Sequence, residues 1–387
     1  MPPTHPVLDR LADLLPDLAE REAESTELRR LAPAVVKQLR DAGVMRIIQP
    51  RRYGGFEADP RVFNEALFAV AKASSSAGWV TGVVGVHSWH LGLYDDRAQA
   101  EVWADDPDTW ISSSYGPSGT ARVVPGGYEL TGRWSFSSGS DQCDWVFVGG
   151  MTIDDEGGPP VYRHFLLPRP DYEIHDVWHT SGLLGTGSND IVVTEAFVPE
   201  HRSMAVSDLL ELRCLGRAVN TGPLFATPWF SVFLNAVVVP LVGMAAAGLD
   251  EALAVHRAKV ATDPSRVPGD LTLARLAEAS AAVDGARTLL LHNLGEIYET
   301  AVAGGTPSVD QRVRAKRDHM VAVGLAVSAV DKAYQSGGPR SIGLASPLQK
   351  LWRDVHAGEH HAVNLPDAAY PDFGRYLVTG DAGPGPF

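Results

Sequence analysis

Four long helical runs fill the C-terminal part of this chain without an intervening strand, and they limit the folds that it can adopt. The helical pattern covers residues 230–262, 270–303, 309–336 and 347–363. Gly337-Gly338 ends the third run. Four consecutive helices predict a bundle, and they do not fit the strand–helix alternation that produces a doubly wound parallel sheet.

A β-rich segment and a second helical region precede the bundle. Valine-rich and aromatic runs separated by Gly, Pro and Asp predict strands after residue 110, two of them flanking Pro125-Gly126-Gly127. Before them the pattern is helical: Pro33 suits a first helical turn, Gly43 suits a helix end, and Ser74-Ser75-Ser76 suits a cap. We therefore predict an α+β chain with an N-terminal helical domain, a middle β domain and a C-terminal helical bundle, at 1–109, 110–205 and 206–387.

Charge and cysteine content exclude several classes of protein. There are 33 Lys and Arg against 47 Asp and Glu, a net charge of −14, which argues against nucleic acid or an anionic membrane as the main partner. Two cysteines, Cys143 and Cys214, form neither a disulfide framework nor a zinc ligand set. Residues 1–10 do not fit a signal peptide, and Pro240 interrupts the apolar stretch 230–249, which we interpret as a core helix. These features predict a cytoplasmic protein.

Common cofactor and hydrolase motifs are missing. Residues 185–190 lack the third glycine of G-x-G-x-x-G, and the chain has no P-loop and no G-x-S-x-G elbow. One metal motif is present, because residues 356–360 match H-x-x-E-H, which would place His356 and His360 on one helix face with Glu359 as a base. A zinc hydrolase needs a further acidic ligand downstream, and none is evident, so we keep zinc only as an alternative.

Several other residues could carry chemistry or could be structural. His361, beside that motif, is a candidate general base or a packed histidine. Residues 135–140 and 112–114 are rich in serine, which suits either a polar turn or a surface where a planar cofactor approaches. Trp79 and His87 belong to an apolar helical run in which aromatic residues are more often core than site.

In their order and spacing, these segments resemble the acyl-CoA dehydrogenase superfamily over nearly the whole chain. The resemblance is carried by residues 50–55 (Pro-Arg-Arg-Tyr-Gly-Gly), 134–139 and 182–188, the last followed by Val198-Pro199. Within the superfamily the chain is most similar to two-component flavin-dependent monooxygenases that hydroxylate phenols, of the secosteroid and 4-hydroxyphenylacetate hydroxylase type. That likeness depends on residues 75–79, 82–89, 111–115 and 352–358.

The resemblance implies a fold, a cofactor and a reaction. The fold would be a helical domain, a β-barrel or β-sandwich and a four-helix bundle, assembled as a homotetramer. Reduced flavin (FMNH2 or FADH2) would come from a separate NAD(P)H:flavin reductase and react with O2 to a C4a-hydroperoxide that hydroxylates a small aromatic substrate. His361 would take the phenol proton, the Ser137 hydroxyl would hold the proton near flavin N5, and His87 would line the reaction face.

The resemblance also implies flavin contacts, and some segments depart from the pattern. We expect cofactor contacts from Trp79, Ser112, Ser114, Ser137, Ser138, Arg257 and Gly338, with Arg257 assigned to phosphate on its charge. Residues 337–340 and 362–366 look altered, which leaves the substrate open. Besides the zinc hydrolase, three alternatives remain: an acyl-CoA dehydrogenase with Glu359 as the base, an amine N-oxygenase, and a bundle protein without activity, which would leave Ser137, His87 and His361 unexplained as a set.

Overall fold

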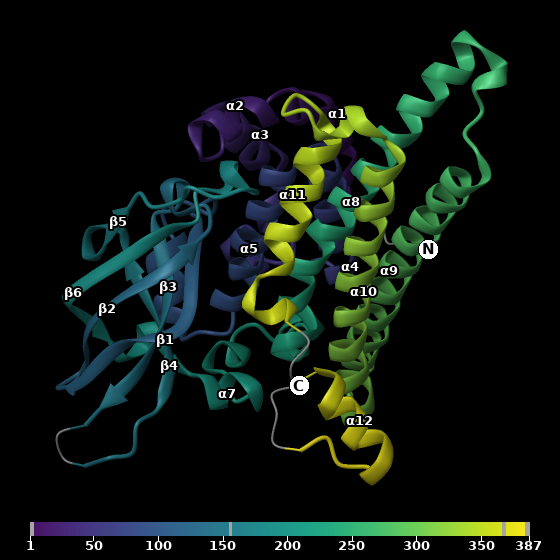
Figure 1. The fold of residues 1–387 in the computed structure, drawn as a ribbon. Coiled ribbons are helices and arrows are strands. Elements are labelled where there is room, and N and C mark those ends of the chain that lie inside the picture. Colours follow the sequence, from purple (N-terminus) through teal and green to yellow (C-terminus); the bar gives the residue numbers. More distant parts are fainter. Residues whose placement is uncertain (1–3, 155–156, 366–368, 384–387) are drawn as a thin grey trace.

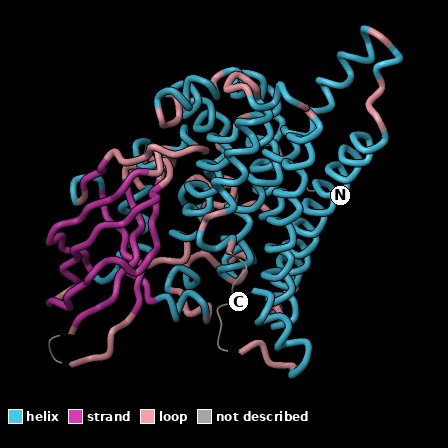
Figure 2. Tube along the Cα trace, viewed as in Figure 1, coloured by secondary structure: helices cyan, strands magenta, loops and turns pink. Residues whose placement is uncertain are grey.

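A β-sheet lies against one side of a larger group of helices in the computed structural model, which describes residues 4–154, 157–365 and 369–383 (Figures 1 and 2). The chain begins with six helices: α1 (Pro6–Glu20), α2 (Glu22–Leu28), α3 (Pro33–Ala42), α4 (Pro60–Ala73), α5 (Ser75–Leu91) and α6 (Asp96–Trp103). The expected signals set their ends. Pro33 occupies the first turn of α3, and Gly43 follows it with φ 75°, a left-handed conformation that glycine adopts without a steric penalty.

Seven strands form one mixed sheet: β1 (Ile111–Val124), β2 (Gly127–Ser137), β3 (Trp145–Ile153), β4 (Tyr162–Pro168), β5 (Glu173–His175), β6 (Asn189–Pro199) and β7 (Ser203–Ala205). Their order is β5-β6-β2-β1-β3-β4-β7. The β1–β3 pair is parallel and the other pairs are antiparallel. This differs from the barrel or sandwich that we expected. Among the described residues, the end strands β5 and β7 do not pair with each other, so the sheet does not close into a barrel. Strand β1 pairs with both β2 and β3, so the strands form one sheet and not the two sheets of a sandwich.

The C-terminal part contains α7 (Val206–Leu210), α8 (Trp229–Thr262), α9 (Asp270–Val302), α10 (Val309–Ser336), α11 (Pro347–Glu359) and α12 (Ala369–Thr379). Three of the four predicted runs match α8, α9 and α10 to within one residue. The fourth ends four residues early, because His361 leaves the helical conformation and caps a short 3₁₀ turn, Ala362–Asn364. Helix α8 is long and apolar enough to cross a membrane, but its most apolar window is entirely buried inside the chain.

The hydrophobic core joins the first and last parts of the sequence. Buried residues of α1, α3, α4, α5 and α6 belong to the same cluster as those of α8 to α11 and as Phe147 and Leu166 of the sheet. The neighbouring residues Val146, Val148, Phe165 and Leu167 belong to a second cluster within the sheet. Helix α5 is central to this arrangement because it packs against α4, α8 and the start of β1. Helix α5, which carries Trp79 and His87, therefore lies between the sheet and the bundle helix α8 (Figure 1).

Candidate active site

Helix α5 carries two of the predicted site residues. Every residue of this helix except Val83 is buried, so the chain covers it from all sides. Ser74 begins the helix, since its side chain accepts a hydrogen bond from the Ala77 N–H. Trp79 and His87 are eight residues apart, which puts them about 12 Å apart along the axis at 1.5 Å per residue. The helix thus defines the two ends of a candidate site.

His87 presents one free nitrogen to the protein interior. Its Nδ1 lies 2.5 Å from the Ile111 carbonyl oxygen, which can only accept, so Nδ1 carries the proton. Nε2 is therefore an acceptor, and it is buried without a partner. Burial lowers the pKa of His87 to about 4, although the bond to Ile111 opposes the shift. The imidazole is consequently neutral near pH 7, with its lone pair available.

Two serines of the sheet also have buried hydroxyls, which lack an oxygen or nitrogen partner among the residues that the structure describes. Ser112 follows Ile111 on β1, and its Oγ lies beside the Cys143 thiol. Ser137 ends β2, and its Oγ is buried and unpaired. Next to it, Phe136 has φ 69°, a strained conformation for a bulky residue, and its ring is 70% exposed. Strain of this kind gathers at functional sites, because surrounding structure must hold it in place.

Three other predicted cofactor contacts already use their polar atoms within the chain. The Trp79 indole N–H donates to Ser138 Oγ at 3.2 Å, and Ser138 Oγ lies 2.7 Å from Ser188 Oγ. The Ser114 hydroxyl donates to the Ser135 carbonyl at 2.7 Å. Ser114 thereby ties β1 to the end of β2 near Ser137. These three side chains shape the site, and their hydrogen bonds fix it.

His361 lies at the other end of the site. Its ring stands edge-on to Trp79 with centroids 5.8 Å apart, so Trp79 connects it with Ser138. Its Nδ1 accepts a long bond of 3.4 Å from the Val363 N–H, which leaves the proton of the neutral ring on Nε2. Burial lowers the pKa of His361 to about 4. His361 therefore offers a donor where His87 offers an acceptor.

Two residues that the sequence did not reveal hold the turn containing His361. On α10, His319 Nε2 lies 2.8 Å from Asn364 Oδ1, and the Asn364 amide donates to the Gly358 carbonyl at 2.8 Å. Burial, with a smaller contribution from His361, lowers the pKa of His319 to about 4. Asn364 belongs to the altered segment after His361, so attention to that segment could have found it. His319 stands alone on a helix and gave no signal.

Arg257 and Gly338 lie apart from this group within a single chain. Arg257 is exposed near the C-terminal end of α8, which projects away from the sheet (Figure 1). Gly338 is exposed after α10 and has φ 73°. Their cofactor contacts stay predictions.

The zinc alternative finds no support in the geometry. His356 Nδ1 bonds to the Trp352 carbonyl and His360 Nδ1 bonds to the His356 carbonyl, so each ring is tied to its own helix. Across residues 4–154, 157–365 and 369–383, no three His, Cys, Asp or Glu side chains are grouped to hold a metal.

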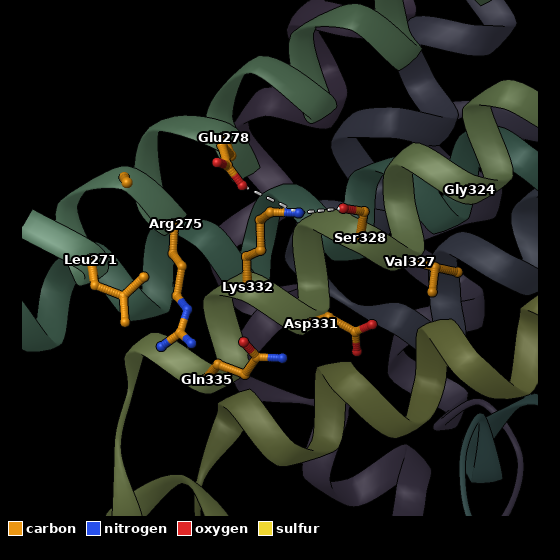
Figure 3. A pocket seen from close by; sticks show the side chains of 10 residues that line it. Leu271, Arg275, Glu278, Gly324, Val327, Ser328, Asp331, Lys332 and Gln335 are labelled. Atoms are coloured by element: carbon orange, nitrogen blue, oxygen red, sulfur yellow. Dashed lines mark hydrogen bonds and ion pairs between the residues drawn. The ribbon is translucent and has the colours of Figure 1, made fainter.

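A groove of about 450 Å³ lies elsewhere, between α9 and α10 (Figure 3). It is open to solvent, and Lys332 crosses it to reach Ser328 and Glu278. None of the predicted site residues lines it. The groove is therefore separate from the group around His87 and Ser137.

Comparison with known proteins adds independent information. The family model for the acyl-CoA dehydrogenase C-terminal domain matches residues 236–366. The oxygenase subunit HsaA of a flavin-dependent monooxygenase from Rhodococcus jostii is 41% identical, over 97% of this chain and 98% of its own length. The oxygenase component of an FADH2-dependent resorcinol hydroxylase from a Rhizobium species is 32% identical, over 90% of this chain and 88% of its own length.

A solved structure agrees in fold as well as in sequence. The crystal structure of a 3-HSA hydroxylase from Rhodococcus sp. RHA1 superposes with a TM-score of 0.94 at 40% identity. The match covers 97% of each chain. The mixed helix-and-sheet fold is thus shared over nearly the whole length of both chains.

Proposed function

Because this chain belongs to the oxygenase components of the flavin-dependent monooxygenases, we propose that it hydroxylates a phenolic ring at the site lined by His87, Ser112 and Ser137. One observation carries the assignment to these residues. Each contributes a buried polar side-chain atom that has no oxygen or nitrogen partner within the described part of the chain. Leaving such an atom unpaired costs about 1–3 kcal/mol, so a bound molecule that pairs with it gains that energy.

The residues present suit a reduced flavin. Ser137 offers a hydroxyl at the end of β2, and Trp79 and His361 form an aromatic boundary beside it. Gly139, with φ 71°, lets α5 approach this turn, since a Cβ there would lie 2.9 Å from Val80. Reduced flavin, when bound, would supply the two electrons that activate O2, one atom of which enters the ring while the other leaves as water. We propose that Ser137 donates to the flavin edge, while the choice between FMN and FAD stays open.

His87 is the better placed of the two candidate bases. A proton acceptor needs a free lone pair, and the bond from Nδ1 to Ile111 guarantees one on Nε2. Moving a proton from a phenol of pKa about 10 to an imidazole of pKa about 4 costs about six pKa units, or about 8 kcal/mol, before the reaction. His87 therefore takes the proton as the new carbon–oxygen bond forms, when the phenol becomes far more acidic.

His361 keeps a role at the same site, although we expected it to be the base. With its proton on Nε2, the neutral ring donates a hydrogen bond. His319 and Asn364 fix its turn, so this donor is held in place. We propose that His361 orients the flavin or the oxygen atom being transferred, and that His87 receives the phenol proton.

The relatives are named as oxygenase subunits or components, which implies a separate reductase that delivers the reduced flavin. We also propose a homotetramer in the cytoplasm. Apolar residues are exposed on the projecting turn between α8 and α9 and at the start of α9, where Val267 is 56%, Leu271 66% and Leu273 42% exposed (Figure 1). Packing this arm against another copy would cover them and could bring Arg257 to a neighbouring site. Analytical ultracentrifugation would show the assembly.

The activity is tested by supplying each half of the reaction separately. Chemically reduced FAD or FMN is mixed with the protein, aerated buffer and a panel of phenols that includes resorcinol, and hydroxylated products are quantified. We expect product with reduced flavin and none with oxidised flavin. Bleaching of oxidised flavin by an acyl-CoA, without a hydroxylated product, would instead support dehydrogenation with Glu359 as the base.

A further inference from the structure

A buried ion network of three charged residues joins helices α2 and α11. Lys350 Nζ on α11 donates to Glu22 Oε1 on α2 and to Asp354 Oδ2, both at 2.6 Å. The Asp354 side chain is 3% exposed and that of Glu22 is 13% exposed. Burial alone would lower the pKa of Lys350, but the two carboxylates outweigh it and raise the pKa. The three charges are thus mutually required.

Each carboxylate also accepts hydrogen bonds from a segment next to the candidate site. The Glu22 carboxylate accepts bonds from Ser74 and Ser76 at the start of α5, the helix of Trp79 and His87. Asp354 Oδ1 accepts the Leu183 N–H at 2.7 Å. Leu183 has φ 53°, a left-handed conformation that a leucine rarely adopts, and Asp354 helps to hold it there.

From Leu183 a chain of hydroxyls leads back to the site. Thr186 Oγ1 donates to the Leu183 carbonyl at 2.8 Å. Thr186 Oγ1 and Ser188 Oγ are 2.7 Å apart, as are Ser188 Oγ and Ser138 Oγ. The Trp79 N–H donates to Ser138 at 3.2 Å.

The direction of every bond in this chain is determined. A carbonyl only accepts and a hydroxyl has one proton, so Thr186 must give its proton to Leu183. Ser188 must then donate to Thr186, and Ser138 must donate to Ser188. All the hydroxyl protons therefore point toward Leu183, and none is left to rotate toward another acceptor.

We propose that Asp354 is a positioning residue of the flavin site, which acts by holding Leu183 and so fixes the chain Thr186–Ser188–Ser138–Trp79. This inference depends on the proposed function, because the chain ends beside Ser137 and His361. Without the Asp354 oxygen that accepts its N–H, Leu183 would leave its left-handed conformation. The hydrogen-bonded series of hydroxyl groups would then lose the Leu183 carbonyl at its end, and Trp79 and Ser138 would lose their fixed arrangement.

Two substitutions separate positioning from general stability. Asp354→Ala and Asp354→Asn both remove the charge that pairs with Lys350, so both should lower Tm by a similar amount. Only asparagine keeps an oxygen that accepts the Leu183 N–H. The Kd for reduced FAD is measured anaerobically by fluorescence, well below the lower Tm. We expect a Kd about tenfold higher for Asp354→Ala and within about threefold of wild type for Asp354→Asn.

A double substitution tests the chain itself. Asp354→Ala combined with Ser138→Ala should raise Kd no more than the larger single change, because both interrupt one chain, whereas independent effects would multiply. Thr186→Val removes the middle hydroxyl group of the series, and its Kd for reduced FAD tests the inference if Asp354→Ala does not fold. Lys332→Met is the control, since it removes a bundle ion pair with Glu278 and should leave Kd within about twofold.

Three results would count against this account. An Asp354→Ala Kd within about twofold of wild type would overturn the inference. Equal increases in Kd for Asp354→Ala and Asp354→Asn, in proportion to their loss of Tm, would also overturn it. Failure of the wild-type protein to bind either reduced FAD or reduced FMN would refute the proposed function, and this inference with it.

Discussion

Replacing His87 by asparagine should abolish hydroxylation and leave the site otherwise intact. The amide nitrogen of asparagine can take the place of Nδ1 and donate to the Ile111 carbonyl, as the ring does at 2.5 Å. Nothing in asparagine takes the place of Nε2, the buried acceptor without a partner. The substitution therefore removes the acceptor and keeps the bond that ties α5 to β1.

The size of the effect follows from the role of His87. A positioned general base contributes about 10²- to 10⁴-fold, or about 3–5 kcal/mol of the activation barrier. With a pKa of about 4, His87 is protonated at pH 7 in only about 0.1% of molecules, so nearly all wild-type molecules hold a free acceptor. We expect turnover of the His87→Asn variant at pH 7 to fall by at least about a hundredfold.

The assay follows hydroxylated product from reduced FAD, O2 and a phenol, together with Tm and the Kd for reduced FAD. His356→Asn is the matched control, because His356 Nδ1 makes the same kind of bond to a backbone carbonyl, at 2.7 Å from Trp352 O, outside the site. Turnover of His87→Asn within about threefold of wild type would refute the reasoning. Loss of turnover in His361→Asn alone would return the role of base to His361.

Three further results are expected. Ser137→Ala should weaken reduced-flavin binding by about 5- to 50-fold, the loss of one hydrogen bond of about 1–2 kcal/mol in a buried site, and an unchanged Kd would remove Ser137 from the flavin contacts. Acid should destabilise the fold before the carboxylates titrate. Burial lowers the pKa of five histidines, namely His87, His90, His164, His319 and His361. Between about pH 6.5 and 4 the unfolded chain therefore binds more protons than the folded chain, and the free energy of unfolding falls as the pH falls. Urea unfolding should then show a free energy that falls by more than about 2 kcal/mol from pH 6.5 to 5, and a flat profile would contradict the burial of neutral imidazoles. Gly139→Ala should cost about 1–3 kcal/mol and impair flavin binding, since its φ is positive and its Cβ would meet Val80 at 2.9 Å; Gly126→Ala has a similar φ and open space, so it should cost only the strain and leave flavin binding unchanged.

Local signals in the sequence predicted the helices and turns well. Pro33, Gly43 and Ser74 each begin or end a helix as expected, because capping and left-handed geometry depend on single residues. Strand pairing was harder to predict. The parallel β1–β3 pair depends on contacts between distant segments, and no local pattern distinguishes one mixed sheet from a barrel.

The sequence predicted the types of residue at the candidate site, but not the hydrogen bonding of their polar atoms. His87, Ser112 and Ser137 share a property that only three dimensions reveal, a buried polar atom without a partner. The tautomers that favour His87 as the acceptor depend on the Ile111 and Val363 backbones, which no residue pattern specifies. Asp354 was visible only as part of the segment 352–358, and its role depends on the conformation of Leu183, far away in sequence.

Incorporation of isotopically labelled O2 tests the central claim most directly. The protein is mixed anaerobically with reduced FAD and a phenol from the panel that yields product, then exposed to labelled O2, and the product is examined by mass spectrometry. We predict one labelled oxygen atom on the ring, and at least about a hundredfold less labelled product when His87→Asn replaces the wild type. An unlabelled hydroxyl group, or a product that has lost two hydrogen atoms and gained no oxygen, would contradict the assignment as an oxygenase.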